Sequence, residues 1–265
     1  MAKRTFHIWG IHAVSAMLKF NPQDALEIWL REANDVSTHA ELAIAAERAG
    51  ASIKYVSMKA LDKLSNGANH QGVVANRRNP AAGDLQVVAE ASMKHSDDAS
   101  ARSTDSAAPI FLALDQIKDP QNFGACLRLA DLAGVSAVLV AGAGQAPLNG
   151  VVAKVASGAM DSVQIVQISN LAQGLLKLKK AGFWIVGTDD QASDAYHDTD
   201  LTGPICLVLG SEGQGMRSRT TELCDFLISI PTTGIVGSLN VSNAAAVCLF
   251  EARRQRREKT RRELS

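Results

Sequence analysis

The sequence has no excess of either charge, because 27 lysines and arginines are matched by 27 aspartates and glutamates. A neutral chain lacks an overall positive field for attracting nucleic acid, although a local basic patch could still act. Runs of apolar residues long enough to span a bilayer are also missing, and the stretch around Lys3 and Arg4 has no apolar segment of the signal-peptide type. We therefore expect a cytoplasmic protein without membrane contact.

Cysteine is scarce, and no two cysteines form a C-x-x-C pair. Each of the four lies within or beside an apolar segment, which is typical of buried free thiols in a reducing compartment. We therefore expect no zinc site and no other metal. The four are Cys126, Cys206, Cys224 and Cys248.

Two nucleotide-binding signatures are absent as well. The chain has no P-loop, and Gly142-Ala143-Gly144-Gln145 lacks the third glycine of a dinucleotide fingerprint and is followed by Pro147. These absences disfavour an NAD-type oxidoreductase. No internal repeat is present.

What the chain does contain is 46% apolar residues, enough for a substantial core. Residues 1–77 predict a small α/β domain, whose strands and helices alternate with apolar periodicities of two and of 3.6 residues. The polar turn before its last strand contains His70, for which a hydrogen-bonded turn histidine is the favoured interpretation. Strands are expected at 25–30, 53–56 and 72–76, and helices at 11–18, 38–49 and 57–64.

Residues 78–108 change in composition to Ala, Ser, Asp and Asn, with few large apolar side chains. Such a segment buries too little surface to offset the entropy of ordering it, so it predicts a flexible linker, with a helical patch near 85–91. From residue 109 to 265 apolar strands alternate with helices, which indicates a second α/β domain with a mostly parallel sheet covered on both faces.

Three polar constellations in this second domain could carry chemistry. The first runs from Asp115 to Arg128, where Asn122 is expected to cap a helix and Arg128 falls on the face turned away from the core. The second is the turn 210–215, which contains Glu212 and follows an apolar strand. The third is 237–242, at the entry to the last helix, where either Ser238 or Asn240 could be the cap.

Taken one by one, these residues have ordinary structural explanations. A single exposed arginine is usually a solvated surface residue, and a glutamate in a glycine-rich turn is often only a loop acid. However, two polar turns that follow strands of one α/β unit suggest a ligand lying across their backbones.

Together and in this order, the three constellations resemble the signature motifs of the SpoU (TrmH-type) RNA ribose 2′-O-methyltransferases of the SPOUT superfamily. The likeness covers residues 109–257. Residues 7–14 and 69–75 are similar to the L30e-like RNA-binding extension of many members, especially those that methylate a guanosine ribose in 23S rRNA. The resemblance implies an α/β domain with a C-terminal trefoil knot, a homodimer, and S-adenosyl-L-methionine (AdoMet) bound in the knot loops.

The resemblance also implies roles for individual residues. AdoMet would contact Thr188, Gly210, Ile230 and Leu239, while Asn122, Arg128, Glu212, Ser238 and Asn240 would form the catalytic set.

Arg128 matches the family arginine that is often assigned as a general base. Because arginine titrates at about 12.5 to 13.8 and is not readily deprotonated in proteins, we expect it instead to hold the target phosphate with two hydrogen bonds and to stabilise charge. That phosphate or a water molecule would accept the proton.

Several alternatives stay open. The substrate could be a tRNA rather than the favoured rRNA, or the chain could be a catalytically silent RNA-binding factor for ribosome assembly. The basic tail 253–262 is expected either to be a solvated helix end or to contact RNA.

Overall fold

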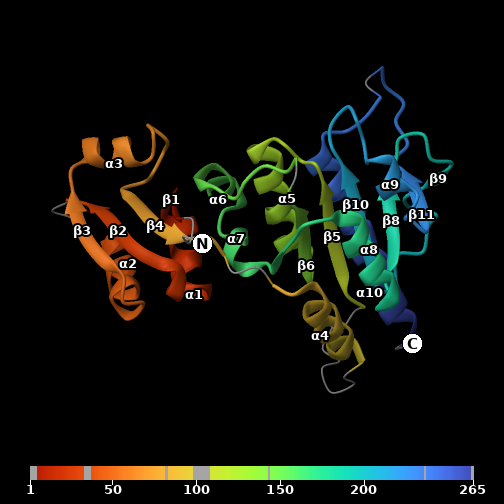
Figure 1. The fold of residues 1–265 in the computed structure, drawn as a ribbon, viewed down its shortest axis with the longest axis horizontal. Coiled ribbons are helices and arrows are strands. Elements are labelled where there is room, and N and C mark those ends of the chain that lie inside the picture. The colour runs from red at the N-terminus through yellow and green to blue at the C-terminus, as the bar shows by residue number, and fades with distance from the viewer. Residues whose placement is uncertain are drawn as a thin grey trace. The chain divides into compact units, whose positions relative to one another are not determined.

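The computed structural model describes residues 5–32, 37–80, 83–97, 108–142, 144–235 and 237–263. These residues form two compact units (Figure 1). Unit 1 contains the residues up to 80 together with Pro147–Ser162, and unit 2 contains the remainder. The segment 147–162, which forms two short helices, therefore packs with the N-terminal residues, although strands of unit 2 precede and follow it in the chain.

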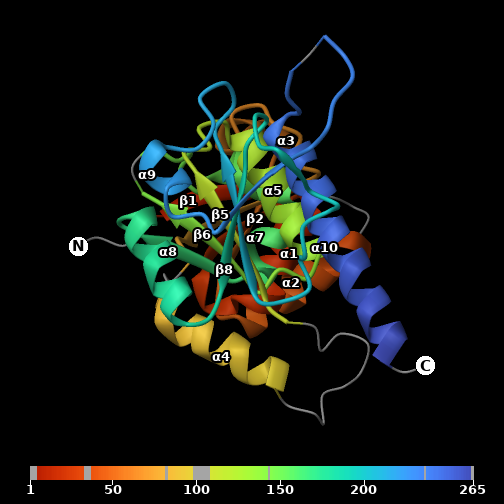
Figure 2. The same cartoon turned by 90° about the vertical axis from the view of Figure 1, so that its right-hand side faces the viewer.

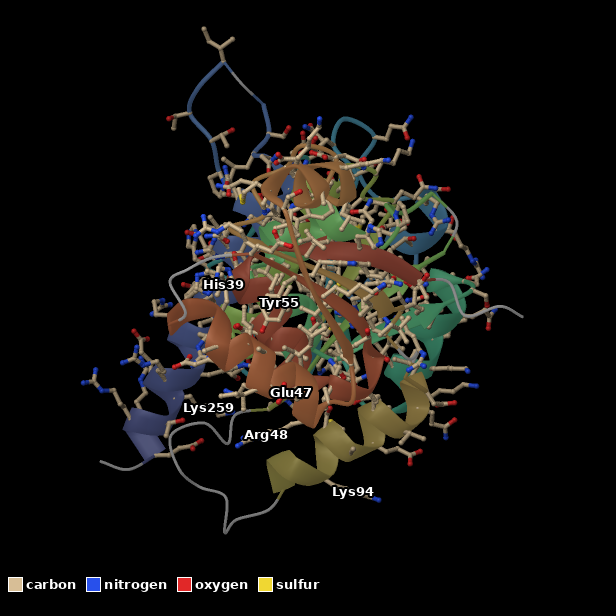
Figure 3. The ribbon with its side chains drawn as sticks, turned by 90° about the vertical axis from the view of Figure 1, so that its left-hand side faces the viewer. His39, Glu47, Arg48, Tyr55, Lys94 and Lys259 are labelled. Carbon is tan, nitrogen blue, oxygen red and sulfur yellow. The ribbon has the colours of Figure 1, made fainter. Side chains whose placement is uncertain are left out.

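Unit 1 is built on a four-stranded mixed sheet in the order β1-β4-β2-β3. Strand β4 is antiparallel to both β1 and β2, and β3 is parallel to β2. Strand β1 is additional to the expected strands. Exposed residues of this unit include Glu47 and Arg48 in the last turn of α2 and Tyr55 on β3 (Figure 3). The strands are β1 (Thr5–Trp9), β2 (Ala25–Arg31), β3 (Ser52–Val56) and β4 (Val73–Arg78), and the helices are α1 (Ile11–Phe20), η1 (Pro22–Asp24), α2 (Ser37–Arg48), α3 (Met58–Leu64), α6 (Gly150–Ala156) and α7 (Ala159–Ser162).

A buried arginine holds unit 1 together. The Arg77 side chain is fully buried, and its Nη1 donates to Asp161 Oδ2 at 2.7 Å while Nη2 donates to Asp24 Oδ2 at 3.2 Å. A buried cation requires such partners, because removing it from water is otherwise very unfavourable. The ion pairs join β4 to α7 and to η1.

His70 is a hydrogen-bonded turn histidine, as expected. Its Nδ1 accepts a bond from the Gly72 N–H at 3.0 Å, so the ring's other nitrogen, Nε2, is the one that donates to Asp62 Oδ1 at 3.2 Å. The residue is 3% exposed. It fixes the turn that leads into β4.

Part of the predicted linker is an ordered helix, α4 (Leu85–Asp97). Leu85 and Ala89 are buried against α8 (Leu171–Lys180), with Val88 and Met93 beside them. The helical patch expected near 85–91 is thus longer than expected, because these four positions form a narrow apolar face. Residues 98–107 of the predicted linker lie outside the described residues.

Unit 2 contains a seven-stranded sheet whose paired strands are all parallel, which confirms the expected parallel sheet. Helices α5 (Pro120–Leu132) and α10 (Val241–Glu263) cover one face, and α8 and α4 lie on the other (Figure 2). No helix in the described ranges is both long and apolar enough to cross a bilayer. The strand order is β7 (Ile165–Ile168), β6 (Ala137–Ala141), β5 (Ile110–Asp115), β10 (Ile205–Gly210), β8 (Trp184–Thr188), β11 (Phe226–Ser229) and β9 (Asp194–Ala195), and α9 (Ser218–Thr221) lies between β10 and β11 in the chain.

The order of the strands creates a position for a ligand. From β5 the chain moves through β6 to β7, whereas β8 and β11 lie on the other side of β10. Connections that leave neighbouring strands in opposite directions open a crevice at the carboxyl ends of a parallel sheet. The segments that follow β8, β10 and β11 meet at this end of unit 2 (Figure 1).

The basic residues of α10 have different surroundings. Arg256 is buried, and its guanidinium donates to three backbone carbonyl groups; burial lowers its pKa to about 10. Arg254 pairs with Glu251 and Glu258, whereas Lys259 is exposed (Figure 3). The carbonyl groups bound by Arg256 belong to Ala108, Leu201 and Gly203.

Candidate functional site

A cavity of about 350 Å³ lies at the carboxyl ends of β8, β10 and β11, beside the start of α10. It is lined by the four residues that the resemblance assigned to the cofactor, namely Thr188, Gly210, Ile230 and Leu239. The remaining lining is divided evenly between glycine or apolar residues and polar or charged residues. The structure thus brings together the ends of β8 and β10 and the segment between β11 and α10.

The turn after β10 shapes one wall of this cavity. Ser211 and Gly215 exchange two backbone hydrogen bonds, of 3.0 and 2.8 Å, which closes the turn. A side chain at Gly210 would overlap the peptide between Gly215 and Met216, so only glycine fits there. Gly213 and Gly215 have φ angles of 78° and 64°, which favour glycine. The cavity is therefore bordered by backbone that a ligand can approach closely.

Asn122, Glu212 and Asn240 form a hydrogen-bonded triangle beside the cavity. Glu212 Oε1 accepts from Asn122 Nδ2 at 2.6 Å and from Asn240 Nδ2 at 2.8 Å. Asn240 Nδ2 also donates to Asn122 Oδ1 at 2.9 Å. One residue from each of the three constellations thus meets the other two, and the short bonds to the carboxylate are charge-assisted.

The two asparagines of the triangle differ in whether they cap a helix. Asn122 was expected to cap α5, but the N-cap is Asp119, whose side chain accepts from the Gln121 N–H, with Pro120 at the first helical position. The expectation was wrong because proline is favoured one position after the cap. Of Ser238 and Asn240, the cap of α10 is Asn240, whose Oδ1 accepts from the Ser242 N–H at 2.8 Å.

The other predicted catalytic residues lie apart from the triangle. Ser238 lines the cavity but makes no hydrogen bond to the described residues. Arg128 is exposed on α5, does not line the cavity, and has no ion pair or hydrogen bond within the described part of the chain. It lies about 9 Å along the helix axis from Asn122. Its contact with a substrate stays a prediction.

Cys126 lies one turn after Asn122 but is not a nucleophile. Burial and, to a smaller extent, the nearby Glu212 carboxylate raise the pKa of this thiol to about 12, so the sulfur stays protonated at neutral pH. No group of three or more potential metal ligands is found in the described ranges.

Sequence reasoning missed several residues that line the cavity. Asp189 and Asp190 follow β8 directly, and Met216 follows the glycine turn. The two acids had a signal, because polar residues at the carboxyl end of a buried parallel strand commonly face a ligand. Met216 had none.

The fold and these motifs place the chain in a known family: it belongs to the SpoU rRNA Methylase family, whose model matches residues 109–250. A second model, "RNA 2'-O ribose methyltransferase substrate binding", matches residues 7–80.

Curated relatives match nearly the whole chain. The 23S rRNA (guanosine-2'-O-)-methyltransferase RlmB of Shewanella oneidensis is 43% identical, and the match covers 94% of this chain and 97% of the relative. The protein of the same name from Yersinia pestis is also 43% identical, with 94% and 97% covered. Among solved structures, the SpoU methyltransferase AviRb from Streptomyces viridochromogenes in complex with AdoMet has a TM-score of 0.76 at 23% identity, covering 95% of this chain and 90% of that one. It supports the fold.

Proposed function

We propose that this protein transfers a methyl group from AdoMet to a ribose 2′-hydroxyl of RNA, with a guanosine of 23S rRNA as the target. The triangle of Asn122, Glu212 and Asn240 beside a glycine-walled cavity carries the proposal. Relatives that are 43% identical over nearly their full length bear the name of this activity. The substrate-binding model over residues 7–80 supports RNA as the partner.

The cavity suits AdoMet in size and in chemistry. Its volume of about 350 Å³ is within the range of small-molecule sites. Apolar side chains such as Ile228 and Ile230 would pack against the adenine ring, and the glycine backbone would lie close to it. AdoMet carries a sulfonium and an ammonium group, and the carboxylates of Asp189 and Asp190 complement that positive charge. Thr188, Gly210, Ile230 and Leu239 would hold the cofactor.

When bound, AdoMet supplies an electrophilic methyl group. The residues around it then have to bind and orient a ribose. Glu212 fixes the side-chain amides of Asn122 and Asn240, and these amides with Ser238 would orient the ribose or its phosphate by hydrogen bonds. Because they are held before the substrate arrives, little reorganisation is needed during the reaction.

Arg128 would bind the phosphate of the target nucleotide. Its guanidinium is exposed and uncompensated among the described residues, as a substrate-binding cation must be. Two parallel hydrogen bonds from its fork would fix the phosphate and stabilise the negative charge that develops on the 2′-oxygen. The 2′-hydroxyl proton would pass to a phosphate oxygen or to water, since the guanidinium remains charged.

Finer features of the family belong to the same proposal. We propose a trefoil knot in the C-terminal part of residues 109–265, an L30e-like fold for residues 1–77, and a homodimer. The family resemblance supports all three. A cytoplasmic location follows from an rRNA substrate, and the cavity residues give no reason to invoke a metal.

The test is a methyl-transfer assay with a tritium-labelled donor on 23S rRNA from cells that lack this gene, with total tRNA and 16S rRNA as controls. We expect label only in 23S rRNA, and mass spectrometry of nuclease fragments should place it on a guanosine ribose. Label in tRNA alone would replace the substrate. No label in any RNA, with AdoMet still bound, would indicate a catalytically silent RNA-binding factor.

A further inference from the structure

Asp115 is a fully buried carboxylate at the end of β5, outside the cavity and outside the triangle. Its Oδ1 accepts from Arg217 Nε at 2.8 Å and from Arg217 Nη2 at 2.7 Å. Its Oδ2 accepts from the Arg217 backbone N–H at 3.0 Å and from Thr220 Oγ1 at 2.8 Å. Four donors on one carboxylate compensate the burial of its charge.

The position of Asp115 connects the two ends of the glycine turn. In the sheet, Asp115 is the register partner of Gly210, the first residue of the turn. The Arg217 that its side chain binds follows Met216, the last turn residue on the cavity wall. Asp115 thus contacts both ends of the segment that contains Glu212: it pairs with Gly210 in the sheet and accepts hydrogen bonds from Arg217.

Asp115 also begins the segment that leads into α5. Only three residues separate it from Asp119, the N-cap of the helix that carries Asn122. The short hydrogen bond between Asn122 and Glu212 requires that α5 and the turn after β10 keep their relative positions. Within the described residues, Asp115 is bonded to the turn and is covalently continuous with the start of α5.

We propose that Asp115 is a positioning residue of the methyl-transfer site: together with Arg217 it sets the conformation of residues 210–217, and thereby the cofactor cavity and the place of Glu212. This inference rests on the proposed function for the identity of the cofactor. The hydrogen-bond geometry that carries it does not depend on the RNA substrate.

The isosteric variant Asp115→Asn isolates this role. An asparagine has one acceptor oxygen and one donor nitrogen. Two of the four groups that donate to Asp115 would therefore face the asparagine NH2 group, which cannot accept a hydrogen bond. If the nitrogen replaces Oδ2, the Arg217 backbone N–H loses its acceptor, and if it replaces Oδ1 the guanidinium does. Arg217→Gln and Thr220→Val remove fewer bonds, and Arg217 is 41% exposed, so these variants place a smaller demand on folding.

Asp225 supplies the matched control. Its Oδ2 accepts from the Ile185 backbone N–H at 2.8 Å and its Oδ1 pairs with Lys179 Nζ at 2.8 Å. It thus resembles Asp115 in binding one backbone amide and one cation of the same unit. However, it directly precedes β11 and binds Ile185 near the start of β8, which is the end of that strand opposite the cavity, and it does not line the cavity.

The experiment measures S-adenosylhomocysteine affinity by calorimetry, hydrogen exchange of residues 211–217, and the melting temperature of each full-length variant. We expect Asp115→Asn and Arg217→Gln to weaken binding by about 10- to 100-fold and to speed exchange in the turn. Arg217→Lys should restore part of the affinity, because it retains a cation. Asp225→Asn should change the affinity less than about twofold, within the error of a neutral substitution.

The outcomes are separable. The proposal would be overturned if Asp115→Asn and Asp225→Asn lowered the melting temperature equally and also weakened S-adenosylhomocysteine binding equally. If Asp115→Asn does not fold, Arg217→Gln and Thr220→Val decide in the same way, and unchanged affinity and exchange in both would overturn it. A wild-type protein that does not bind S-adenosylhomocysteine would instead refute the proposed function. Steady-state kinetics should show a raised KM for AdoMet and an unchanged KM for RNA.

Discussion

Replacing Glu212 with alanine should slow methyl transfer while leaving the protein folded. The side chain is exposed and contributes no core packing, and water can replace its two hydrogen bonds, so its removal should lower the free energy of unfolding by no more than about 1 kcal/mol. The change removes two hydrogen bonds, of 2.6 and 2.8 Å, that hold Asn122 and Asn240. A typical hydrogen bond contributes a net stabilisation of about 0.5–1.5 kcal/mol. If both bonds stabilise the transition state by this amount, their loss raises the activation free energy by about 1–3 kcal/mol, which is a roughly 5- to 150-fold slower reaction.

The assay is a single-turnover measurement at saturating RNA and AdoMet, combined with urea unfolding. Glu212→Gln is the informative companion, because its amide oxygen can still accept from both asparagines and only the charge is lost. We expect rates in the order wild type, glutamine, alanine. A rate for Glu212→Ala equal to wild type would refute the role of the triangle, and a large loss of stability would show that Glu212 is mainly structural.

Four further substitutions test other parts of the structure. Arg128→Lys should lower the single-turnover rate at least about tenfold because lysine lacks the guanidinium fork, with S-adenosylhomocysteine affinity unchanged; a near-normal rate at every pH would exclude a need for that fork. Gly210→Ala should weaken S-adenosylhomocysteine binding at least about tenfold by displacing the turn, and unchanged calorimetric affinity would contradict the close contact. Arg256→Gln should destabilise the protein by about 2–4 kcal/mol in urea unfolding because three carbonyl groups lose their donor. The neighbouring Arg257→Gln should leave stability unchanged but reduce RNA affinity and flatten its salt dependence, and equal RNA affinity would make the tail a solvated helix end.

Much of the secondary structure could be predicted because the signals are local. Apolar runs such as Ile205–Leu209 indicated buried parallel strands, and Gly50 indicated the end of α2. The order of the strands could not be predicted, since parallel strands that are buried on both faces carry similar apolar side chains. The packing of Pro147–Ser162 with unit 1 was equally inaccessible, because a short apolar helix does not specify its partner.

The site was predictable as a set of motifs but not as a geometry. Glycine turns and polar residues after strands indicated where a ligand binds, and the family resemblance named the residues. The triangle joins Asn122 to positions 90 and 118 residues away, which no local pattern specifies. Asp115 was visible as an acid that ends an apolar strand, yet its role depends on Arg217, 102 residues further along the chain. The misplaced cap of α5 was avoidable, because Asp119-Pro120 is a recognised helix start.

Asn240 performs two tasks with the two atoms of one amide: its oxygen begins α10, and its nitrogen binds the triangle. A substitution that removes both atoms, such as Asn240→Ala, will therefore break the triangle and also loosen the first turn of a 23-residue helix. Asparagine is the cap-forming residue that also provides an N–H donor, so activity and helix capping together favour it at this position. Glu212, which has no such second task, is where the two can vary independently.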